Sequence, residues 1–161
     1  MTPSNTKTAG ATTTASRTSQ KKEFAPFGTH DVSSFYDLTI PRNDRPILNE
    51  IVSTLKIFAA NHGTSGYFAD NLITIGRNMG FMNNKRFVHS ITDSAREAAD
   101  LHKLWRLHIY SWACRTALSV PGDMVECGVY RGLYVDSVIK FLGPDSFANR
   151  LFYLYDSFSG L

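Results

Sequence analysis

The sequence has few cysteines and no long apolar run. Its two cysteines, Cys114 and Cys127, form neither a C-x-x-C pair nor a His/Cys ligand set, which argues against a structural zinc site and suits a reducing compartment. No apolar stretch approaches the roughly 20 residues that a membrane span needs, and the N-terminus lacks the apolar core of a signal peptide. These absences predict a cytoplasmic protein without a membrane partner.

Clustered positive charge is also missing. The formal net charge is only +3, and several of the basic residues lie in the first 23 positions, so no nucleic-acid partner is expected. Residues 1–23 are dominated by Thr, Ser, Ala, Asn and Gln and have almost no large apolar side chains. Such a composition cannot bury enough surface to offset the entropy of ordering, which predicts a disordered tail.

Residues 24–120 are predicted to form a helical N-terminal lead-in. Scattered aromatic residues with Pro and Gly in segment 24–43 indicate an irregular stretch that packs onto another part of the protein. A helix is expected over residues 45–60, after a possible N-cap at Asn43 or Asp44 and with Pro46 in its first turn. Its predicted apolar stripe is Ile47, Ile51, Leu55 and Phe58.

The periodicity of residues 67–81 is ambiguous. One interpretation is a short helix from Asp70 to Asn78 that Gly80 ends, with Arg77 either a solvated charge or an anion contact. A further short helix is expected over residues 84–90. The segment 94–97 (Ser-Ala-Arg-Glu) matches a capping box and predicts a long helix over residues 94–118. Its expected stripe is Ala98, Leu101, Trp105, His108 or Ile109, and Trp112.

Histidines on this predicted helix do not suggest a metal site. His102 and His108 are six positions apart and point to different faces, so they cannot form the i, i+4 pair of a helical metal centre.

The last part of the chain, residues 121–161, predicts a strand, a helix and a second strand. Residues 124–127 form a short apolar strand, and a glycine turn leads into a helix that Gly143-Pro144 ends. Residues 151–155 form the second strand, and a crossover helix between two strands implies that they are parallel. The fold class is therefore α/β.

The glycine turn has the position of a cofactor site. Ligands of doubly wound sheets lie beyond the carboxyl ends of the strands, where Gly128 and Gly132 stand, and an acid after the second strand, here Asp156, suits ribose hydroxyls. The dinucleotide fingerprint requires glycines where this chain has Tyr130 and Leu133, which argues against NAD, and no P-loop lysine follows.

S-adenosylmethionine (SAM) carries no phosphate and fits this turn better. Backbone N–H groups of the turn can meet its carboxylate. Glu126 can meet its ammonium, directly or through water, or can help to fix the loop.

Two motifs in this region resemble one known family. The stretches Gly122-Asp123-Met124-Val125-Glu126-Cys127-Gly128-Val129-Tyr130-Arg131-Gly132 and Leu154-Tyr155-Asp156-Ser157-Phe158-Ser159-Gly160-Leu161 resemble the macrocin O-methyltransferase family of SAM-dependent class I methyltransferases. The resemblance extends weakly upstream, through residues 67–81 and 105–108. It implies a truncated Rossmann-like core whose first β-α-β unit, residues 121–161, begins an incomplete SAM-binding domain after the helical lead-in.

The resemblance also implies site residues. Those expected to contact SAM are Glu126, Gly128, Val129, Tyr130, Arg131, Asp156, Ser157 and Phe158, with Asp156 on the ribose. Leu133 and Tyr134 stand where that family often has small residues, so packing at the start of this helix is expected to differ. Family members use Mg²⁺ and a general base, and the resemblance places both beyond Leu161, so no catalytic residue or metal ligand is assigned here.

The expected function is O-methyl transfer from SAM to a hydroxyl of a small-molecule or sugar acceptor. Two strands leave an open sheet edge, so we expect the chain to be a fragment that alone is inactive, binds SAM poorly and tends to associate, with a homo-oligomer as one outcome. The alternative is a non-catalytic Rossmann-like module that retains the nucleotide turn and serves in assembly.

Overall fold

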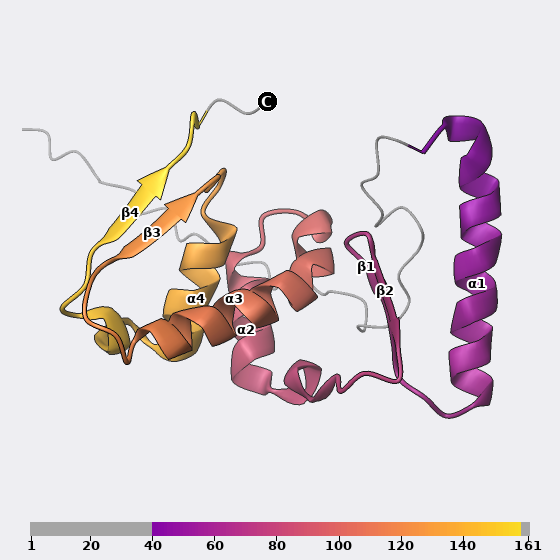
Figure 1. Ribbon diagram of the computed structural model, residues 1–161, viewed down its shortest axis with the longest axis horizontal. Coiled ribbons are helices and arrows are strands. Elements are labelled where there is room, and N and C mark those ends of the chain that lie inside the picture. The colour runs from indigo at the N-terminus through magenta and orange to yellow at the C-terminus, as the bar shows by residue number, and fades with distance from the viewer. Residues whose placement is uncertain (1–39, 159–161) are drawn as a thin grey trace, which may run out of the picture.

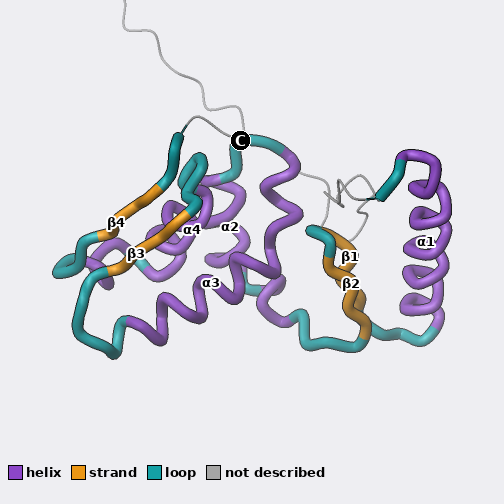
Figure 2. The backbone as a smooth tube through the Cα atoms, turned by 45° about the horizontal axis from the view of Figure 1, so that its top comes forward, coloured by secondary structure: helices purple, strands orange, loops and turns teal. Residues whose placement is uncertain are grey.

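The computed structural model describes residues 40–158. The predicted tail and nearly all of segment 24–43 lie outside this range. Helix α1 stands at one end of the molecule beside a β-hairpin, helices α2, α3 and α4 form the middle, and a pair of strands, β3 and β4, lies at the other end (Figures 1 and 2). The described chain thus contains both helices and strands, as expected for an α/β protein.

Helix α1 spans Arg45–Asn61 and confirms the predicted helix, with Pro46 in its first turn. Val52 and Ala59 are its buried residues, and they pack against Phe68 of the hairpin. The predicted apolar stripe is partly wrong, because its members Ile47, Ile51 and Phe58 are 59%, 50% and 50% exposed. The hairpin covers only one side of the helix, and that side is centred on Val52, Ala59 and the half-buried Leu48 and Leu55.

Residues 66–75 form an antiparallel hairpin, so the predicted helix over residues 70–78 is wrong. Strand β1 (Gly66–Ala69) pairs with β2 (Leu72–Ile75) in a register that sets Ala69 opposite Leu72. Asp70 and Asn71, at φ 56° and 57°, make the two-residue loop between them. Asp and Asn tolerate this left-handed conformation, which favours a hairpin whose twist matches its strands. Arg77 consequently lies in the loop between β2 and a 3-10 turn, η3 (Gly80–Asn83).

Helix α2 spans Lys85–Ser94 and extends the predicted short helix. The predicted helix over residues 94–118 is wrong over residues 94–103. Ala95 is extended, a 3-10 helix η4 (Ala98–Lys103) follows, and α3 begins only at Leu104 and ends at Ala117. The Asp100 carboxylate accepts the N–H groups of Arg96 and Glu97 at 3.0 and 3.3 Å, which satisfies the backbone at this break. The capping box therefore joins Glu97 and Asp100, not Ser94 and Glu97.

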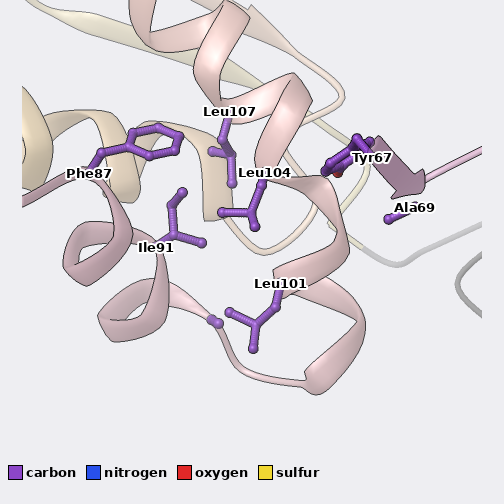
Figure 3. Packing of buried hydrophobic residues seen from close by; sticks show 8 residues of the cluster. Tyr67, Ala69, Phe87, Ile91, Leu101, Leu104 and Leu107 are labelled. Carbon is purple, nitrogen blue, oxygen red and sulfur yellow. The ribbon is translucent and has the colours of Figure 1, made fainter. Parts of the chain in front are cut away.

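The main core lies where the hairpin, α2, η4 and α3 meet (Figure 3). Its fully buried members include Ile91 of α2 and Leu104 and Leu107 of α3. The predicted stripe of α3 is wrong at Trp112, which is 63% exposed. The helix restarts at Leu104, so its inward face follows Leu104, Leu107, Ser111 and Cys114.

A buried carboxylate ties the hairpin to α3. Asp70, whose side chain is 3% exposed, accepts two contacts from the Arg106 guanidinium, at 2.5 Å from Nε and 2.7 Å from Nη2. Burial raises the pKa of Asp70, and Arg106 opposes that rise. The Tyr67 hydroxyl adds a second link by donating to the backbone oxygen of His102, and burial raises the pKa of Tyr67 to about 12.

The C-terminal part has the predicted strand-helix-strand order. Strand β3 (Met124–Cys127) pairs in parallel with β4 (Phe152–Tyr155), and α4 (Leu133–Leu142) and a 3-10 turn, η5 (Pro144–Phe147), connect them. Helix α4 packs against α2 and α3, with Val138 fully buried. Gly143 at φ 94° ends the helix, as predicted. Within residues 40–158, no helix combines the length and apolar character needed to cross a bilayer.

Candidate cofactor site

The site lies where β3 and β4 both end. Strand β3 runs into a turn at residues 128–132, and α4 begins directly after it. The parallel register sets Cys127 opposite Tyr155, and the N–H of Gly128 donates to the carbonyl of Tyr155 at 2.8 Å. This hydrogen bond extends the strand pairing by one step and brings the turn beside the residues that follow β4.

The Asp156 carboxylate joins the two loops. Its Oδ2 accepts the backbone N–H of Tyr130 at 2.6 Å, and its Oδ1 accepts the N–H of Phe158 at 2.9 Å. These two N–H groups hold the pKa of Asp156 below its ordinary value, so the group is an anion at neutral pH. Each carboxylate oxygen has a second lone pair, and a surface carboxylate fixed in this way can still accept hydroxyl groups.

Four residues around Asp156 have left-handed backbone conformations. Gly128 and Gly132 have φ of 77°, Tyr130 has 50° and Phe158 has 55°. Left-handed conformation costs a residue with a side chain about 1–2 kcal/mol, so Tyr130 and Phe158 are strained, and each donates its N–H to Asp156. Such strain concentrates at ligand sites.

The space beside the turn is open to a ligand. A Cβ placed on Gly128 would meet no atom of residues 40–158 within 4 Å, whereas one on Gly132 would meet the Val135 side chain at 3.7 Å. No side chain caps α4 at Gly132. The first N–H groups of an α-helix have no partner within the helix, so the start of α4 offers donors to an anionic group.

Glu126 is buried at the end of β3 and faces α3. It is 8% exposed, and its Oε2 accepts the Tyr110 hydroxyl at 2.9 Å. Burial raises the pKa of Glu126, and the Tyr110 hydrogen bond partly offsets that rise. No described residue donates to its other oxygen, Oε1. Glu126 thus anchors the strand end to α3 through one of its two carboxylate oxygens.

The side chains of the turn are held in different ways. Val129 is 4% exposed, so only its backbone can meet a ligand. Arg131 lies 4.8 Å from the ring centroid of Tyr130 and 3.6 Å from the Glu97 carboxylate. The rings of Tyr130 and Phe158 are 52% and 64% exposed at the edge of the site.

The structure therefore brings the predicted site residues into one place from two loops. Sequence reasoning missed two of their partners, Tyr110 and Glu97. Both come from the helical region before β3. The hydrogen bond from Tyr110 to Glu126 spans 16 residues and the ion pair of Glu97 with Arg131 is also non-local, so no local pattern reveals them. Leu133 and Tyr134 both lie against the main core, and the Tyr134 ring is 5.6 Å from that of Tyr110.

The fold and the turn are those of an α/β protein with a glycine-containing loop at the end of parallel strands. Residues 85–161 match the family described as macrocin-O-methyltransferase (TylF). Over this part of the chain, the match confirms the resemblance that the two motifs indicated. The match starts at α2 and so includes α3 as well as the cofactor turn. No curated protein and no solved structure matches the chain.

Proposed function

We propose that the turn at residues 128–132 and the loop at residues 156–158 bind SAM, and that the chain belongs to an O-methyltransferase whose acceptor is a hydroxyl of a small molecule or sugar. In this proposal β3, α4 and β4 are the first unit of a Rossmann-like sheet. The family match over residues 85–161 carries the proposal. The hydrogen bond from Tyr130 to Asp156 supports it, because it joins the two loops that the family motifs mark.

The residues present suit the chemical groups of SAM. Asp156 is an anion with lone pairs left for the ribose hydroxyls. The open space beside Gly128 and the uncapped start of α4 suit a carboxylate. Oε1 of Glu126 suits an ammonium group, while Oε2 keeps the strand end in place through Tyr110. Exposed rings of Tyr130 and Phe158 offer flat surfaces at the edge of the site.

SAM supplies an activated methyl group on a sulfonium. The residues of this chain contribute by binding and orienting, since displacement at the methyl carbon depends on in-line alignment with the acceptor oxygen. The acceptor also has to lose its proton to a base. Among residues 40–158, no group of three His, Cys, Asp or Glu side chains is placed to hold a metal ion. The Mg²⁺ and base of the family are therefore not assigned to any described residue.

One observation favours the alternative, a non-catalytic Rossmann-like module that retains the nucleotide turn and serves in assembly. The β3–β4 pair exposes large apolar side chains, with Val125 at 66% and Tyr155 at 60%. Apolar surface on an unpaired sheet edge favours association with further strands or another chain. An assembly module would show this association without binding SAM.

Methyl-transfer and SAM-binding measurements separate the two functions. The protein expressed to the end of its reading frame is incubated with methyl-labelled SAM and a panel of sugars and small hydroxylated molecules. The proposal expects label in a hydroxyl acceptor and saturable SAM binding. Association of the protein without any SAM binding would support the assembly module instead.

A further inference from the structure

A cavity of about 180 Å³ lies among η3, α2, α3 and α4, away from the cofactor turn. We call it the aromatic pocket, because its walls include Phe81, Phe87, Trp112 and Phe141. Phe141 stands in the last turn of α4, and Gly132 of the cofactor turn precedes the first turn. At 1.5 Å per residue, the two are about 13 Å apart along the helix. The aromatic pocket is therefore separate from the cofactor turn.

Rings form the walls of the pocket in fixed orientations. Phe81 stacks on the His108 imidazole, with 4.3 Å between centroids and 9° between planes. Phe87 packs edge-on against Phe141 at 5.3 Å. Trp112, which is 63% exposed, lies at the rim. The size suits one ring, because a cavity of about 150 Å³ accommodates benzene.

The charged group in the wall is Arg115. Its guanidinium lies 5.4 Å from the Phe141 ring centroid, and among the described residues no carboxylate pairs with it. Burial lowers the pKa of His108, so the imidazole is neutral at pH 7 and Arg115 provides the positive charge. Among the residues that the structure describes, no acidic side chain lines the pocket. A cationic ligand would be attracted by the ring faces but repelled by Arg115, whereas an anion would gain a bidentate partner in the guanidinium.

A second cavity of about 360 Å³ adjoins the first, and the two share Asn84, Arg115 and Phe141. Arg86 lines this second cavity. Its Nη2 lies 3.2 Å from the position that a Cβ on Gly143 would occupy. Gly143 stands at the end of α4, where a cation is favourable. Arg86 thus lies beside the end of α4 and lines the second cavity alone, whereas Arg115 lines both cavities.

We propose that the aromatic pocket binds a small aromatic carboxylate, with the ring against Trp112 and Phe141 and the carboxylate on the Arg115 guanidinium. The ring contributes stacking and apolar burial, and the arginine contributes a charge-assisted hydrogen bond. A purely structural role for Arg115, covering Phe141 with its stem, requires neither a ring nor an anion.

Three probes separate these contributions. Benzoate has the ring and the charge, benzamide has the ring without the charge, and acetate has the charge without the ring. Each is titrated into the 161-residue chain while tryptophan fluorescence is recorded, and Trp112→Phe shows whether the signal comes from the pocket. We expect saturable binding of benzoate with a dissociation constant of about 1 mM or lower. The dissociation constants of benzamide and of acetate should each be higher than that of benzoate by a factor of about ten or more.

Variants of the arginine test its role. Arg115→Gln should lower benzoate affinity to that of benzamide, and Arg115→Lys should retain part of it, because the charge stays but the fork is lost. Arg45→Gln, on exposed α1, is the matched control and should bind benzoate normally. The proposal is overturned by absence of saturable benzoate binding, by equal affinities for benzoate and benzamide, or by unchanged benzoate affinity in both Arg115 variants.

Discussion

The backbone N–H of Tyr130 donates to Oδ2 of Asp156 at 2.6 Å and so joins the loops that follow two parallel strands. Because this bond and that of Phe158 lower the pKa of Asp156, the folded protein favours the carboxylate more than the unfolded chain does. The stabilisation is present above the ordinary pKa of an aspartate and is lost as the pH falls through the lowered value. The two loops should therefore stay joined throughout the neutral range.

Gly128→Ala tests the left-handed turn. Gly128 has φ 77° and no neighbour near its Cβ position, so the substitution should cost only the backbone penalty of about 1 kcal/mol in unfolding free energy. The added methyl group should also weaken SAM binding, because it enters the open space beside the turn. Gly63→Ala is the matched control, since Gly63 has φ 59° and also has no neighbour there. Urea unfolding and SAM titration of both variants check this, and equal SAM affinities would contradict the placement.

Tyr110→Phe tests the anchor of the strand end. Removing the hydroxyl leaves the buried Glu126 without its donor and should destabilise the fold by about 1–3 kcal/mol. Chemical denaturation measures the loss. A change of less than about 0.5 kcal/mol, the size typical of an ordinary surface substitution, would show that the hydrogen bond does not hold α3 to β3.

Glu126→Gln tests the pH dependence of that anchor. Because burial raises the pKa of Glu126, its stabilising contribution is present at low pH and is lost as the pH rises through the raised value. The glutamine variant has no such loss, so its stability relative to the natural protein should increase between pH 5 and pH 8. Unfolding midpoints at both pH values are compared, with the exposed Glu50→Gln as control. If the stability difference between Glu126→Gln and the natural protein were the same at both pH values, the raised pKa of Glu126 would be contradicted.

Arg106→Leu tests the link between the hairpin and α3. It leaves the Asp70 carboxylate buried and unpaired, which should cost about 3 kcal/mol. Adding Asp70→Asn should recover part of that loss, because the stranded charge is removed and Asn tolerates φ 56°. Asp136→Asn, which breaks an exposed pair with Lys140, should cost about 0.5 kcal/mol or less. Equal losses of unfolding free energy for Arg106→Leu and Asp136→Asn would argue against a buried link.

The sequence predicts the C-terminal unit well because its signals are local. Apolar runs, glycines with left-handed backbone and the Gly143-Pro144 stop occur within a few residues of the elements that they define. The helical lead-in was harder to predict. The pattern after Asp70 predicts a short helix, but Asp70 lies in a hairpin loop, and its carboxylate is paired with Arg106, which is 36 residues away. The pattern of residues 94–97 predicts a helix start at Ser94, but α2 ends there, Ala95 is extended, and the Asp100 carboxylate accepts the N–H of Arg96.

The site shows the same division. Gly128, Gly132 and Asp156 follow from their positions after apolar strands, and the family match covers all three. The left-handed conformations of Tyr130 and Phe158 do not follow from residue type, because side chains disfavour them. They depend on the N–H groups that Asp156 accepts. Likewise, the Tyr110 hydroxyl reaches Glu126 only because α3 packs beside the end of β3.

The most direct test of the cofactor assignment is the affinity for SAM measured by calorimetry on the protein expressed to the end of its reading frame. Asp156→Ala removes the acceptor for the Tyr130 N–H and for the ribose, while Asp145→Ala removes an exposed acid in η5. We predict saturable SAM binding that Asp156→Ala weakens by about tenfold or more and that Asp145→Ala leaves unchanged. An Asp156→Ala protein that binds SAM as tightly as the natural one would contradict the site.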